Sequence, residues 1–288
     1  LLAIYFFVRL YQSDFKQKND AYLFYLAMAL GFMTKGPPAV IIPGMVAFIF
    51  LIATRRQGFW SQMRMGQGLV ILLLVILPWF TTMFLLHGDE FKDHIVGAEI
   101  SNRLVHDTPF SLYFFGVLFR YHMPWVLFFL VAFFHQLGIW SHSISSVSGV
   151  SKSFRQVLSN MKTSVRLLFA RENESALLCY IWILVCLVLF TLVRTEHSRY
   201  MLPASSAVAI LVAKFFSDME KTEADWQGYK VTAILTEIIF LVSAISSCGA
   251  LYIFNLIYSV PIHFFILPAL FLLASISVLG LRKKRQYG

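Results

Sequence analysis

The chain has 288 residues, of which 58% are hydrophobic and only 14% are charged. Soluble domains usually carry about 25% charged residues, so this composition excludes a water-soluble globule. The 24 basic and 15 acidic residues leave a formal net charge of +9. No basic stretch is interleaved with aromatic residues outside the apolar segments, so we expect no nucleic-acid partner.

Long stretches of the chain contain no charged residue, and runs of this length can cross a bilayer as helices. Counted with shorter apolar segments, they predict about eight or nine spans: 1–9, 21–34, 36–53, 66–86, 112–135, 175–193, 200–216, 231–252 and 262–280. The sequence therefore predicts an all-α, polytopic transmembrane helical bundle that forms one membrane-embedded domain over 1–288. Because the chain opens at Leu1 inside an apolar segment, we expect it to be the C-terminal portion of a longer protein.

The basic residues predict the orientation. Strict alternation of the spans places five connecting segments on one side of the membrane: 10–20, 54–65, 136–174, 217–230 and 281–288. Together with Arg9 and Lys214 at their edges, these segments hold 18 of the 24 basic residues. Cytoplasmic connections carry the excess of Lys and Arg, so the C-terminus is predicted to be cytoplasmic and the loop 87–111 to lie on the outer face. Segment 151–171 alternates apolar and basic residues at helical spacing, which is typical of an amphipathic helix that contacts membrane lipids.

Polar residues gather in the predicted outer loop 87–111. Its charged and histidine side chains include Asp89, Glu90, Lys92, Asp93, His94, Glu99, Arg103, His106 and Asp107. His87, Asp89, Asp93, His94 and His106 are metal-ligand types, but their spacing fits no established site. We therefore expect no cofactor and assign no metal ligand, although a divalent metal stays open. A solvated connection is the simpler interpretation of this loop.

Two further outer clusters contain cations at helix breaks. Lys35 precedes Gly36-Pro37-Pro38, where the prolines interrupt helical hydrogen bonding, and a lysine at such a break suits a phosphate or another anionic headgroup. A snorkelling lysine at a helix end is the alternative. Segment 194–200 carries Arg194 and Arg199 and fits either a phosphate grip or a plain polar hairpin. Arg120, inside an apolar stretch, is a functional candidate because charges there are costly.

These residues resemble the motifs of polyprenyl-phosphate-sugar glycosyltransferases, membrane proteins related to protein O-mannosyltransferases and lipid A aminoarabinose transferases (glycosyltransferase family 39). Residues 31–37, Gly-Phe-Met-Thr-Lys-Gly-Pro, resemble the family's GLxxLTKGP signature. Other matches follow in order: Leu77-Pro78-Trp79 at a span end, Glu99 to Arg103 with His106, Pro109 and Tyr113, Pro124-Trp125, and Arg199-Tyr200-Met201-Leu202-Pro203. Many members have a lysine just before this last tyrosine, where the present chain has Arg199.

The resemblance implies a helical bundle with juxtamembrane helices around a lipid-donor cavity. It implies sugar transfer from a polyprenyl-phosphate donor to a lipid or glycan acceptor, such as lipopolysaccharide, or to protein, on the outer face of a bacterial inner membrane. Cations should stabilise the departing phosphate, and we expect Lys35, Arg103 and Arg199 to bind it. Further candidates are His106, Arg120 and Tyr200.

A hydroxyl acceptor needs a carboxylate base. The family's usual carboxylate lies in an outer loop that would precede Leu1, and the local candidates are Asp89 and Glu99. Two alternatives stay open. A lipid-linked sugar transporter or flippase would use the same cavity without chemistry, although no internal repeat of the kind common in transporters is evident. An O-antigen ligase or polymerase would lack the Thr-Lys-Gly-Pro break.

Overall fold

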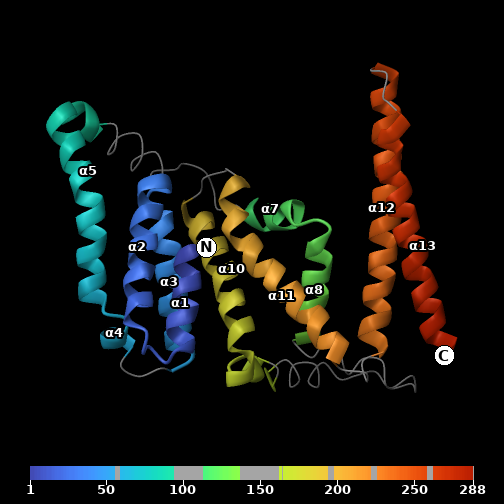
Figure 1. Ribbon diagram of the computed structural model, residues 1–288, viewed down its shortest axis with the longest axis horizontal. Coiled ribbons are helices and arrows are strands. Elements are labelled where there is room, and N and C mark those ends of the chain that lie inside the picture. Colours follow the sequence, from blue (N-terminus) through green and yellow to red (C-terminus); the bar gives the residue numbers. More distant parts are fainter. Residues whose placement is uncertain are drawn as a thin grey trace. The chain divides into compact units, whose positions relative to one another are not determined.

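The computed structural model describes residues 1–55, 59–93, 113–136, 162–163, 165–193, 198–221, 226–257 and 262–287. All regular secondary structure in these ranges is helical, which confirms the predicted all-α class (Figure 1). The helices form two compact units. Unit 1 comprises Leu1–His122 with Val165–Ile210, and unit 2 comprises Met123–Ser164 with Leu211–Gly288. That the chain is a single domain stays a prediction.

In unit 1, helix α2 contacts α1, α3 and α5, while α10 packs against α3 and α7 (Figure 1). The elements of unit 1 are α1 (Leu2–Gln12), α2 (Lys18–Lys35), α3 (Pro38–Ala53), α4 (Phe59–Gln62), α5 (Met65–Asp93), α7 (Tyr113–Tyr121), η2 (Arg171–Asn173), α10 (Glu174–Val193), η3 (Ser198–Met201) and the first half of α11 (Leu202–Lys221). Aromatic rings fill the junction of α1, α2 and α3. Phe7 lies 6.1 Å from Phe24 and 6.0 Å from Phe50 between ring centroids.

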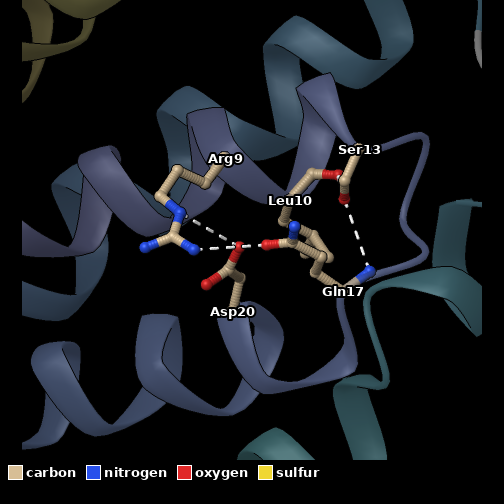
Figure 2. A network of polar contacts seen from close by, with 5 residues as sticks. All are labelled: Arg9, Leu10, Ser13, Gln17 and Asp20. Atoms are coloured by element: carbon tan, nitrogen blue, oxygen red, sulfur yellow. Dashed lines mark hydrogen bonds and ion pairs between the residues drawn. The ribbon is translucent and has the colours of Figure 1, made fainter.

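A polar network closes the turn between α1 and α2 (Figure 2). Arg9 Nε lies 3.4 Å from Asp20 Oδ2, and Arg9 Nη2 donates to Gln17 Oε1 at 3.3 Å. Ser13 Oγ donates to the Leu10 carbonyl at 2.8 Å and accepts from the Gln17 backbone amide at 3.4 Å. The Asp20 side chain is only 3% exposed, so the ion pair compensates its loss of water.

Unit 2 contains a long helical hairpin. Helix α12 (Trp226–Ile257) packs along α13 (Ile266–Tyr287), with η4 (Ile262–Phe265) between them, and also contacts α8 (Trp125–Gln136). Val131 and Ala132 of α8 form a small buried cluster with Phe215 and Leu235. Ser275 Oγ donates to the Glu237 carbonyl at 3.3 Å and ties α13 to α12.

The described residues do not support the span count predicted from the sequence. Among the described residues, four helices are long and apolar enough to cross a membrane: Met65–Phe91, Arg171–Leu192, Ser198–Asp218 and Thr232–Asn255. A fifth is added if Tyr113–Tyr121 and Trp125–Phe134 form one broken span. Eight or nine spans are therefore not supported.

Helix length and residual charge explain the difference. Helices α1 and α3 have 11 and 16 residues, fewer than the roughly 18 that a bilayer requires. Helix α2 has 18 residues but carries Lys18, Asp20 and Lys35, and the apolar part of α13 covers only Pro268–Gly280. Counting apolar runs ignores where each helix begins and ends.

Two predicted juxtamembrane segments lie mostly outside the described residues. Of the outer loop 87–111, the structure describes only 87–93, at the end of α5. Of the amphipathic segment 151–171, it describes 162–163 and 165–171, and of these 162–163 and 165–168 are α-helical. The roles of both segments stay predictions.

Candidate functional site

A cavity of about 330 Å³ in unit 1 brings together segments that lie far apart in the sequence. Its wall is formed by the start of α1, the end of α2, the start of α3, and residues of α10, η3 and α11. Most lining side chains are apolar, and the polar ones include Thr34, Lys35, Arg199 and Tyr200. Two of the cations that the sequence analysis expects to bind the phosphate therefore line one cavity.

The break after α2 places Lys35 at the edge of this cavity. Lys35 is the last residue of α2, where the helix dipole favours a basic side chain. Gly36 follows with φ 74°, a left-handed conformation that glycine adopts without penalty, and its amide donates to the Phe32 carbonyl at 2.7 Å. Pro37 then caps α3 and Pro38 begins it, because proline suits the first positions of a helix.

The two helices flanking this break approach closely. A Cβ atom added to Gly31 of α2 would lie 3.0 Å from Ala39 Cβ of α3, so a larger residue would force Ala39 to shift. The Thr34 hydroxyl donates to the Gly31 carbonyl at 2.8 Å, so it has a hydrogen-bond partner within the last turn of α2. Both features hold the Lys35 backbone in a defined place.

The short helix η3 supplies the second cation. Arg199 has an exposed side chain, while the Tyr200 ring stacks on Phe190 of α10 with a centroid distance of 5.1 Å and an interplanar angle of 20°. Met201 is 1% exposed and anchors the end of η3. Helix α11 then begins at Leu202, with Pro203 in its first turn.

The residues in this cavity favour a ligand with an anionic head and an apolar body. Lysine and arginine form charge-assisted hydrogen bonds with phosphate oxygens, and an apolar wall with a few polar groups is typical of ligand pockets. None of the described residues that line the cavity is acidic. The described wall therefore offers a grip for an anion but no carboxylate base.

Several predicted site residues lie elsewhere in unit 1. Asp89 is exposed at the end of α5 and does not line the cavity. Arg120 is exposed on α7, with its guanidinium carbon 5.6 Å from the centroid of the Tyr121 ring, and it does not line the cavity either. Glu99, Arg103 and His106 lie outside the described residues.

No group of three or more metal-ligating side chains is assembled among the residues that the structure describes. Of the candidate ligands in the outer loop, His94 and His106 fall outside those residues. The described chain thus provides no donor set that would hold a cofactor metal.

The structure adds four residues that charge and motif patterns did not indicate. Tyr121 OH lies 2.6 Å from Ser198 Oγ, and His122 Nε2 lies 2.8 Å from Ser205 Oγ. In this stretch only Arg120 stands out by charge. The one sequence signal of Tyr121 and His122 is that two hydrogen-bonding side chains adjoin in an otherwise apolar stretch.

The described residues define a multi-pass helical membrane protein with an apolar-walled, cationic cavity. No family model matches the chain, and no solved structure matches it. It is 24% identical over 197 residues to undecaprenyl phosphate-alpha-4-amino-4-deoxy-L-arabinose arabinosyl transferase 1 of Pseudomonas fluorescens strain Pf0-1, covering 66% of this chain and 28% of that protein. The corresponding transferase 2 of the same strain is 22% identical over 207 residues, covering 69% of this chain and 31% of the relative.

An uncharacterized protein of Aquifex aeolicus is also similar, with 23% identity over 212 residues, or 72% of this chain and 36% of the relative. The chain therefore spans about a third of the length of the curated relatives it matches. Its distant homologues include glycosyltransferases whose names specify a sugar carried on undecaprenyl phosphate.

Proposed function

We propose that the protein transfers a sugar from a polyprenyl-phosphate donor to a cell-envelope acceptor on the outer face of a bacterial inner membrane. The acceptor would be a lipid such as lipid A, another glycan or a protein. One observation carries the proposal: Lys35 and Arg199 line the same apolar cavity, together with Tyr200. This combination suits a lipid phosphate, and the distant relatives named as undecaprenyl-phosphate-linked sugar transferases support the same chemistry.

The two cations fit the leaving group of this reaction. When the bond between the sugar and the polyprenyl phosphate breaks, the phosphate oxygen takes the bonding electrons and leaves as an anion. Preorganised positive charge at that oxygen lowers the barrier, and no general acid is needed there. Lys35 and Arg199 would supply this charge, and Arg103 and His106 are further candidates from the outer loop.

The acceptor side of the reaction needs a different group. A hydroxyl nucleophile must lose its proton as it attacks the sugar, and a carboxylate is a suitable base. Because no described lining residue is acidic, the base has to come from outside this wall. Glu99 and Asp89 are the candidates within this chain.

The experiment compares sugar transfer by membranes that contain the wild-type protein or single variants. In Lys35→Ala and Arg199→Ala we expect transfer of labelled sugar to fall by about 10²- to 10³-fold, the usual effect of removing one group that stabilises a developing oxyanion. Lys214→Ala is the matched control, since Lys214 pairs with Asp218 four residues away and does not line the cavity. It should retain full activity.

Two results would contradict the proposal. Unaltered transfer by Lys35→Ala, at normal expression, would remove the phosphate-binding role of this lysine. Movement of labelled donor across the membrane without any labelled acceptor would instead favour the lipid-linked sugar flippase, which the lack of an acidic residue in the described wall also fits.

A further inference from the structure

Two hydrogen bonds connect segment 198–205, which contains Arg199, to the end of α7, one on each side of the arginine. Before Arg199, the Ser198 hydroxyl lies 2.6 Å from the Tyr121 hydroxyl. After it, the Ser205 hydroxyl of α11 lies 2.8 Å from His122 Nε2. Tyr121 and His122 are adjacent at the end of α7, so this one site holds both ends of segment 198–205.

The His122 ring is itself held in place. Its Nδ1 lies 2.7 Å from the Leu118 carbonyl, and a carbonyl oxygen can only accept a hydrogen bond, so Nδ1 carries a proton. In the neutral ring, Nε2 then accepts from the Ser205 hydroxyl. His122 is 7% exposed, and a buried ring whose two nitrogens are both paired is a rigid anchor.

Aromatic contacts add a third connection to α7. Tyr200 stacks on Phe190 of α10, and Phe190 lies 5.9 Å from Phe114 of α7 between ring centroids. Both residues that adjoin Arg199 are therefore immobilised, Ser198 by a hydrogen bond and Tyr200 by stacking. The Arg199 side chain is left as the exposed group of this short helix.

We propose that Tyr121 and His122 are positioning residues that hold Arg199 toward the anionic group of the ligand in the cavity. Neither residue lines that cavity, so both act through the segment 198–205 and not by touching the ligand. A cation stabilises charge best when its position is fixed before the ligand arrives. The inference rests on the proposed function, because Arg199 has a partner in the cavity only if the ligand carries a phosphate.

The test measures how strongly the purified full chain, in detergent, prefers farnesyl phosphate over farnesol. The ratio of the two dissociation constants isolates the phosphate contribution from that of the apolar tail. We expect Tyr121→Phe and Ser198→Ala each to lower this ratio by about 2- to 10-fold, the range of one net hydrogen bond. Farnesol binding should stay unchanged, which shows that the variant folds normally.

Two backgrounds then show whether Tyr121 acts through Arg199. In Lys35→Ala, where Arg199 remains, Tyr121→Phe should lower the ratio as in the wild type. In Arg199→Ala it should have no further effect. His122→Gln keeps an acceptor for the Ser205 hydroxyl, so it should retain more of the preference for farnesyl phosphate than His122→Ala. Tyr252→Phe, on an α12 residue that is 65% exposed, is the matched control and should change nothing.

The possible outcomes separate the inference from the proposed function. If the wild-type protein binds both probes equally, the phosphate site is wrong and the inference falls with it. If Arg199→Ala loses the preference while Tyr121→Phe and Ser198→Ala keep it, the site stands and the positioning role is overturned. An equal effect of Tyr121→Phe in both backgrounds would also overturn it. Should His122→Ala fail to fold, the Tyr121 and Ser198 variants still decide, because each removes only a hydroxyl.

Discussion

Gly68 allows α5 to approach α2 more closely than any other residue would permit. A Cβ atom at this position would overlap the ring of Tyr25. That ring has no room to retreat, because Tyr25 is 7% exposed and its hydroxyl donates to the Met63 carbonyl at 2.9 Å. Small residues at helix crossings serve this purpose in membrane proteins, where close packing replaces hydrophobic association.

Gly68→Ala should therefore destabilise the protein. Forcing a methyl group into a packed helix crossing costs about 1–3 kcal/mol, which would appear as a lower Tm of the detergent-solubilised protein. Gly66→Ala is the control, because an added Cβ there meets nothing within 4 Å and the change favours the helix. Equal Tm values for the two variants would contradict the close packing at Gly68.

The hairpin of α1 and α2 depends on an ion pair whose two members differ in exposure. The Asp20 side chain is 3% exposed, whereas that of Arg9 is 44% exposed. Loss of Asp20 leaves a cation that water can reach, but loss of Arg9 leaves a carboxylate that is almost fully buried. An unpaired buried charge is the more costly of the two.

We expect Arg9→Ala to lower the unfolding free energy by about 2–4 kcal/mol, and Asp20→Asn by about 1 kcal/mol, since the exposed half of the pair is screened by solvent. Chemical denaturation in mixed micelles measures both. Lys16→Ala, at an exposed position in the same turn, should have little effect. A larger loss in Asp20→Asn than in Arg9→Ala would show that the buried carboxylate does not need its partner.

The orientation of the whole chain depends on whether α13 crosses the membrane. Its apolar part, Pro268–Gly280, is short, but four basic residues follow it directly: Arg282, Lys283, Lys284 and Arg285. Basic clusters of this kind stay on the cytoplasmic side. The charge distribution therefore predicts a crossing by α13, although its apolar part is short. A C-terminal green fluorescent protein fusion should fluoresce, and a C-terminal alkaline phosphatase fusion should be inactive.

The control for this orientation is alkaline phosphatase inserted into the loop 87–111. If that loop faces outward, as the distribution of basic residues predicts, the inserted enzyme should be active. An active C-terminal phosphatase fusion would place the C-terminus outside and would contradict the predicted orientation.

The all-helical class and the membrane environment could be predicted from local features of the sequence. A charge-free run such as 175–193 is apolar whatever its neighbours are, and α10 covers Glu174–Val193 as expected. The helix end at Lys35 was predictable for the same reason, because Gly36 and two prolines interrupt the chain locally. The number of spans was not, since apolar runs such as 36–53 form helices too short to be counted on composition alone.

The cavity, by contrast, is a product of packing. The family resemblance predicts that Lys35 and Arg199 bind one phosphate, but the hydropathy and charge around each residue do not show that they line one cavity. The same holds for Tyr121 with Ser198, and for Gly68 with Tyr25. Hydropathy and charge are properties of single segments, so they indicate which segments are helical and apolar. Which side chains meet depends on how those helices pack, and that is settled by the shapes of residues distant along the chain.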